Sequence, residues 1–143
     1  MDKQFGAFII ATTSAAMGME TSMFFTFWGL QALKKKGLKT GESFFGRMLG
    51  FMFKDIEGVG PSKMNFGGIG RWMFKNMMKD KGVSSLLELR QAAIDLGVKL
   101  QPCQMSMDVM EIRKEDLIDE AEDVVGAATM VLGAQGADMT FFI

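Results

Sequence analysis

The sequence of 143 residues contains no histidine, no tyrosine and a single cysteine, Cys103. Zinc sites of histidine and cysteine, and catalytic triads that need a histidine base, are therefore excluded within one chain. We accordingly expect no metal and no cofactor. A lone cysteine cannot form an internal disulfide, which predicts a reducing, cytoplasmic location. The net charge is −1, so no overall positive field favours binding to nucleic acid.

Long charged runs are also absent from the amino-terminal part of the chain. Residues 5–33 carry one charge, on Glu20. Because polar residues and glycine interrupt this stretch at 12–14 and 18, we expect neither a signal peptide nor a membrane span. The sequence instead predicts a buried strand at 5–12, a loop, and a helix over 19–36 that ends at Gly37.

Residues 41–82 combine phenylalanine and methionine with lysine and arginine. Apolar residues at helical spacing predict two helices, near 44–52 and 69–77, joined by a glycine-rich turn. We interpret this segment as a helical insertion in a single domain of residues 1–143. One possibility is that it folds over the sheet or packs between subunits. Alternatively, its basic face over residues 44–79 binds a membrane surface or a partner, or it covers Cys103 as a lid.

The remaining residues alternate between helix and strand signals. Ser85 and Glu88 form a capping box, which predicts that a helix begins there and ends at Gly97. Residues 98–103 are a predicted strand, followed by a short helix, a short strand near 121–127, a helix near 127–135 and a final strand at 137–143. This alternation predicts an α/β fold, a three-layer sandwich around a mostly parallel, flavodoxin-like sheet.

Ligands of an open parallel sheet gather beyond the carboxyl ends of its strands. Thr12, Thr13 and Ser14 end the first predicted strand and Cys103 ends the later one, so we expect them to line one edge of the sheet. Backbone N–H groups of Gln104, Met105 and Ser106 would then face the sulfur and favour its thiolate. The alternative is that Cys103 is an inert core residue, since free cysteines are often buried.

Four segments of the chain are "FIIATTSAAMGMETSMFFTFWGLQALKK", "PCQMSMDVM", "IRKEDLIDEAEDVVGAATMVL" and "ADMTFFI". Together they resemble the DsrE/DsrF/DsrH-like family, in particular its DsrE-type members with a Met-rich insertion. The resemblance implies a sulfur-relay protein that carries a persulfide on Cys103. It also implies a homo-oligomer with a fold labelled flavodoxin-like or peroxiredoxin-like, and rhodanese-like or TusA-like partners.

The sequence departs from the family pattern at two places. Some relatives carry a further cysteine near the first strand, where this chain has Ala11 to Ser14. Glu111 stands where the family leads us to expect glycine. One cysteine suffices for persulfide transfer, whereas a thiol peroxidase usually needs a resolving thiol or an external reductant, so that activity is the less favoured alternative. A third reading is a non-catalytic interaction module that uses the 41–82 segment.

Overall fold

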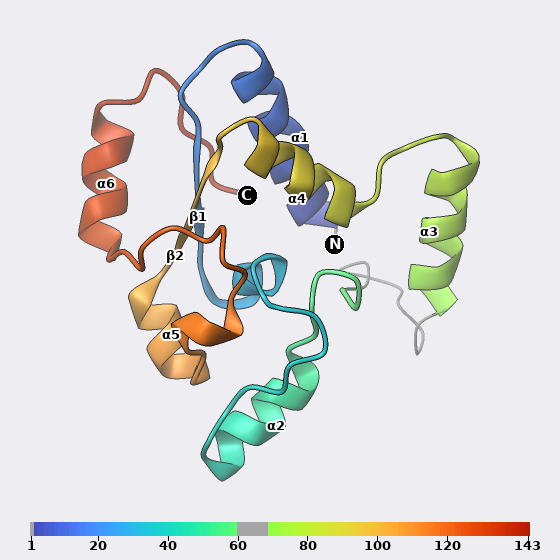
Figure 1. The fold of residues 1–143 in the computed structure, drawn as a ribbon, viewed down its shortest axis with the longest axis vertical. Coiled ribbons are helices and arrows are strands. Elements are labelled where there is room, and N and C mark those ends of the chain that lie inside the picture. Colours follow the sequence, from blue (N-terminus) through green and yellow to red (C-terminus); the bar gives the residue numbers. More distant parts are fainter. Residues whose placement is uncertain (1, 60–68) are drawn as a thin grey trace.

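A computed structural model describes residues 2–59 and 69–143 of the chain. Its elements, in chain order, are α1 (Asp2–Ala16), β1 (Ser22–Phe25), the 3-10 helix η1 (Phe27–Ala32), α2 (Phe44–Met52), α3 (Ile69–Asp80), α4 (Leu86–Asp95), β2 (Lys99–Pro102), α5 (Gln104–Met110), the 3-10 helix η3 (Lys114–Asp116) and α6 (Ala127–Gln135). Helices flank a parallel sheet (Figure 1), which confirms the predicted α/β class.

The sheet pairs two strands that lie far apart in the sequence. Strands β1 and β2 run parallel, with Ser22 opposite Lys99 and Phe25 opposite Pro102. The connection between them contains η1, α2, α3 and α4, as expected for a parallel crossover. Since both strands run in the same direction, their carboxyl ends meet at one edge of the sheet, where Cys103 directly follows β2.

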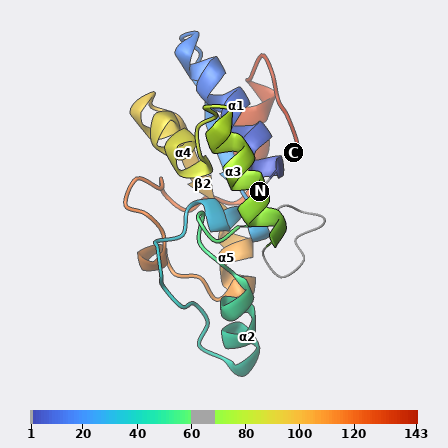
Figure 2. The ribbon, with the colours of Figure 1, turned by 90° about the vertical axis from the view of Figure 1, so that its right-hand side faces the viewer.

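The helices α1 and α4 lie side by side (Figures 1 and 2), and the core extends from them past the sheet to η1, to α5 and to the segments around Phe53 and Leu117. Phe5, Phe8 and Ala11 recur every three residues along α1 and are buried. Leu86 and Ala93 are the buried residues of α4. Burying one large apolar side chain stabilises a fold by roughly 1.5–3 kcal/mol. The burial of these residues of α1 and α4 therefore fixes the side of the sheet that α1 covers.

The amino-terminal segment differs from the prediction. Residues 5–12 belong to helix α1, and the predicted helix at 19–36 contains β1 and η1 instead. A continuous apolar run fits a buried helix as well as a buried strand, so the run alone could not decide between them. Gly18, with φ 83°, follows the last turn of α1 and separates it from β1.

Most other elements agree with the sequence. The capping box of α4 is present: the amide of Glu88 donates to Ser85 Oγ at 3.2 Å, and the amide of Ser85 donates to the Glu88 carboxylate at 2.6 Å. Both insertion helices form, as α2 and α3. Most of the turn predicted between them lies outside the described residues.

Two predicted strands are not seen as strands. The segment near 121–127 contributes a single parallel bridge, between Val125 and Cys103. Residues 137–143 have no regular secondary structure and are exposed. Phe142, for example, is 98% exposed, so no strand in the described part of the chain lies over this segment to bury it.

The length and apolarity of the helices test the expectation that the chain has no membrane span. In residues 2–59 and 69–143, none of the helices is both long enough and apolar enough to pass through a bilayer.

Candidate functional site

Cys103 lies at the carboxyl end of β2, as predicted, and is the residue immediately before α5. Its amide donates to the Phe25 carbonyl at 3.0 Å, and its own carbonyl accepts from the Met107 amide at 3.0 Å. A parallel bridge to Val125 holds it from the other side. The backbone of Cys103 is therefore fixed by β1, by α5 and by the 121–126 segment together.

The sulfur atom is buried rather than open to solvent, since only 2% of Cys103 is exposed. Its side chain makes no capping hydrogen bond at the start of α5 in the described structure. The amide of Gln104 donates to the Val125 carbonyl at 3.0 Å. The prediction that this amide faces the sulfur is therefore wrong, because the amide donates its hydrogen bond to the neighbouring 121–126 segment instead.

The side chains of α5 point in different directions. Gln104 donates to Asp108 at 2.7 Å on the exposed face, and Met105 has 60% of its side chain exposed. Ser106 is completely buried, and among the residues that the structure describes no hydrogen-bond partner reaches its Oγ. Ser106 is thus a polar side chain of α5 that lies in the interior of the protein.

Thr12, Thr13 and Ser14 do not end a strand, because all three lie in α1. The hydroxyls of Thr12 and Thr13 donate to the carbonyls of Phe8 and Ile9, each at 2.7 Å. These bonds within the helix satisfy both threonines, so they are the ordinary local contacts of helical threonine.

The strand end that does meet Cys103 is Phe25, followed by Thr26 and Phe27. Phe27 adopts a left-handed backbone with φ 41°, which is uncommon for a bulky residue. The aromatic-rich "SMFFTF" run is the sequence signal for this strand, because aromatic residues favour strands. Our prediction missed it by including the run in a longer helix.

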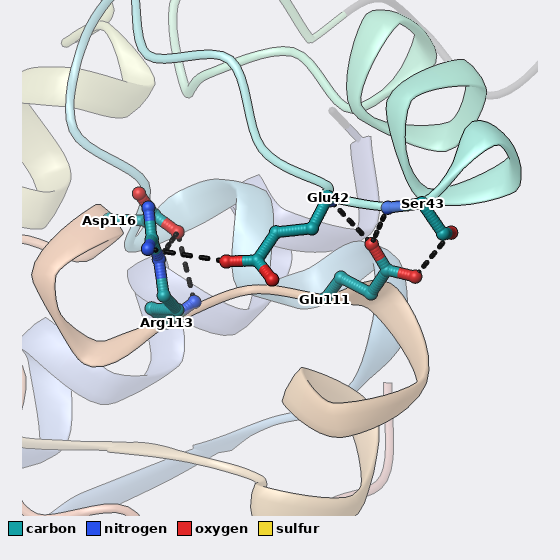
Figure 3. Close-up of polar contacts among 5 residues, drawn as sticks. All are labelled: Glu42, Ser43, Glu111, Arg113 and Asp116. Carbon is teal, nitrogen blue, oxygen red and sulfur yellow. Dashed lines mark hydrogen bonds and ion pairs between the residues drawn. The ribbon is translucent and has the colours of Figure 1, made fainter.

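Beyond α5, Glu111 connects this region to the insertion (Figure 3). The carboxylate of Glu111 accepts from the amides of Glu42 and Ser43, at 2.5 and 2.8 Å, and from Ser43 Oγ at 2.5 Å. These bonds hold the pKa of Glu111 below its ordinary value, and the bond from the Ser43 hydroxyl has the largest effect. Ser43 is the N-cap of α2, so the charge lies at the end of the helix that favours an anion.

The backbone of Glu111 explains why glycine is expected there. Its φ of 50° and ψ of 45° lie in the left-handed region, which glycine adopts without strain. The carboxylate also passes very close to α2: a Cβ atom on Gly46 would lie 2.0 Å from Glu111 Oε2. The glycine at position 46 therefore leaves the space that the Glu111 carboxylate occupies.

The opposite end of α2 is held by a buried cation. Lys34 is 3% exposed and its Nζ donates to the Phe53 carbonyl at 2.6 Å. Burial lowers the pKa of Lys34, with Asp55 and Asp116 acting against that change. Phe53 is the C-cap of α2, so α2 has an anion at its amino end and a cation at its carboxyl end.

Two pockets lie near these elements, and Cys103 lines neither of them. One of about 300 Å³ lies between Glu42, which precedes α2, and residues in and after α5: Met107, Asp108, Glu111, Ile112 and Arg113. A larger one of about 570 Å³ lies between α1, α3 and α4. In the described part of the chain, no group of three or more cysteine or acidic residues is placed to hold a metal ion.

Comparison with known proteins extends over the whole chain. The model of the DsrE/DsrF/DrsH-like family matches residues 1–142. The uncharacterized protein YrkE of Bacillus subtilis is 40% identical over 147 residues, which covers 99% of this chain and 89% of that protein. The sulfur carrier protein DsrE2 of Allochromatium vinosum is 36% identical over 147 residues, which covers 100% of this chain and 91% of that protein.

Proposed function

Because the chain belongs to the DsrE/DsrF/DrsH-like family, we propose that it carries sulfane sulfur as a persulfide on Cys103 and passes it to a partner protein. The observation that carries the proposal is the position of the chain's one thiol at the carboxyl end of β2. In parallel sheets this is the edge where ligands bind. Similarity to a protein named as a sulfur carrier supports the proposal.

The chemistry needs no second residue in the same chain. The Cys103 thiolate attacks the terminal sulfur of a donor persulfide, R–S–SH, and forms a new S–S bond. The S–S bond of the donor breaks, and its electron pair leaves with the thiolate R–S⁻. The product is Cys103–S–SH. A thiolate of the acceptor protein removes the sulfur by the same exchange, so no external oxidant or reductant is consumed.

A buried sulfur requires an opening step before transfer. Cys103 is 2% exposed, so a protein partner reaches it only after a local opening of the segments around it. We therefore expect a thiol-alkylating reagent to label Cys103 much more slowly in the native protein than in the unfolded protein. A donor protein that opens the site should raise the native rate. Rhodanese-like and TusA-like proteins are the donors and acceptors to test.

Intact-mass measurement after incubation with glutathione persulfide tests the proposal. We expect an added mass of about one sulfur atom on the wild-type chain, reversed by dithiothreitol. The variant Cys103→Ser should show no such adduct while keeping the circular-dichroism spectrum and the melting temperature of the wild type. If the wild type takes no sulfur from glutathione persulfide or from the candidate donor proteins, the proposal is wrong.

The exposed face of α2 favours a second role, as a surface that binds membranes or partners. Phe44, Phe45 and Phe51 are 79%, 69% and 86% exposed, and Arg47 lies on the same helix. Exposed aromatic and basic residues together favour anionic lipid surfaces.

Flotation with vesicles of phosphatidylcholine and phosphatidylserine measures this second role. Wild type and Cys103→Ser should float equally, because the thiol plays no part in lipid binding. Phe51→Ser should float less, whereas Thr129→Ser on α6 is the matched surface control. If the wild-type chain stays in the bottom fraction at low salt, binding of α2 to anionic membranes is excluded.

A further inference from the structure

Ser106 is a buried polar side chain whose hydroxyl has no partner in the described residues. It is 0% exposed, and its Oγ neither donates nor accepts within hydrogen-bond distance. Leaving a buried hydroxyl unpaired costs about 1–3 kcal/mol. Such groups are rare in native structures, and a use in binding or catalysis is one of the recognised explanations.

Ser106 lies in the first turn of α5, which directly follows Cys103. Cys103 is the N-cap and Ser106 is the third residue of the helix. Side chains three apart share a helix face, and each Cα–Cβ bond tilts toward the amino end. In helix α4 of the same chain, the carboxylate of the third residue, Glu88, reaches back to the backbone amide of the N-cap Ser85 at 2.6 Å. Ser106 is likewise the third residue after its N-cap, Cys103.

We propose that the Ser106 hydroxyl donates a hydrogen bond to the outer sulfur of the Cys103 persulfide, so that these two residues together form the sulfur-binding site. The inference rests on the proposed function. The hydroxyl makes no hydrogen bond to the free thiol. A disulfide-type S–S bond adds about 2.0 Å to the side chain, so the outer sulfur of a persulfide extends beyond the free thiol, and the Ser106 hydroxyl is a buried donor without a partner in the described residues.

The atoms of the loading step balance without Ser106 changing its covalent state. The Cys103 thiolate forms the new S–S bond, the donor's S–S bond breaks, and the donor leaves as its thiolate. Ser106 keeps its proton and only shares it with the outer sulfur. Ser106 is therefore a positioning and stabilising residue for the loaded state, and in the reduced state its hydroxyl makes no hydrogen bond to any described residue.

The test measures the equilibrium Cys103–SH + GSSH ⇌ Cys103–SSH + GSH by intact mass, where GSH is glutathione and GSSH is glutathione persulfide. We expect Ser106→Ala to lower the loading constant between about twofold and tenfold, the range set by one hydrogen bond. The control Met105→Ala, which changes an exposed neighbour on α5, should load like the wild type.

Two further measurements separate this role from a structural one. The melting temperature of Ser106→Ala should equal or exceed that of the wild type, since the change removes an unpaired buried hydroxyl. The alkylation rate of the reduced Cys103 should also stay the same. A variant that loses loading together with melting temperature would assign Ser106 a structural role and overturn the inference.

The failure of this inference differs from the failure of the proposed function. If the wild type loads and Ser106→Ala loads equally well, the Ser106 assignment is wrong and persulfide transport by Cys103 stands. If the wild type does not load at all, the proposed function fails, and the assignment of Ser106 fails with it.

Discussion

The α/β frame, formed by α1, α4, β1 and β2, and the helix α2 use phenylalanine in opposite ways. In the frame, Phe8 of α1 is completely buried in the core. In α2, Phe51 has 86% of its side chain exposed, and the buried residues are Gly46 and Gly50. The frame is held by apolar burial, whereas α2 is held where its glycine face and its two ends meet the rest of the chain.

This difference shows where the two regions are coupled. A Cβ atom on Gly50 would lie 1.9 Å from the Thr40 carbonyl oxygen, so the glycine face is in close contact with the chain's own backbone. Glu111 contacts the amino end of α2 and Lys34 the carboxyl end. Glu111 directly follows the helix that begins after Cys103. Helix α2 is therefore coupled to the end of α5 through Glu111, and to the core through its C-cap Phe53.

The largest expected effect comes from Phe8→Ala in the frame. Removing a fully buried phenylalanine leaves a cavity, and such changes cost about 3–5 kcal/mol of unfolding free energy. Urea denaturation monitored by circular dichroism measures the loss. The neighbouring variant Ile9→Ala, at a residue 48% exposed, should cost much less. Equal losses for the two variants would show that α1 does not bury the face described.

The second prediction tests the polar contact between Glu111 and Ser43. The pKa of Glu111 is lowered in the folded state from 4.5, so its carboxylate stabilises the fold above about pH 4.5. That contribution is lost as the pH falls through the lower folded pKa, because the protonated group binds the Ser43 amide and hydroxyl less well. The melting temperature of Glu111→Gln should therefore lie below that of the wild type at pH 7, with the difference shrinking in acid.

Two control variants make this prediction specific. Ser43→Ala removes the first cause of the pKa change, so adding Glu111→Gln to it should cost less than the same change in the wild type. Glu115→Gln, an exposed carboxylate on η3, should leave the melting temperature unchanged. A difference between Glu111→Gln and the wild type that stays constant from pH 7 to pH 3 would contradict the role assigned to the charge.

The same comparison explains what the sequence could predict. Local signals between specific residues were reliable: Ser85 and Glu88 form their capping box, and the family's glycine position at Glu111 has a left-handed backbone. Cys103 at a strand end followed from the β2 pattern. The assignment of Thr12 to a strand failed because an apolar run carries no periodicity that separates a buried helix from a buried strand. The burial of Ser106 depends on tertiary packing, which no local pattern encodes.

The smallest expected effect comes from Phe51→Ala on α2, the exposed counterpart of Phe8→Ala. Surface substitutions away from special contacts change unfolding free energy by within about 0.5 kcal/mol, and an 86% exposed side chain meets that condition. Urea denaturation should thus separate the two phenylalanine variants by several kcal/mol, about the full cost of the buried one. A large loss for Phe51→Ala would mean that another surface covers the aromatic face of α2 in solution. A change in the size-exclusion elution volume between wild type and Phe51→Ala would then identify a second copy of the chain as that surface.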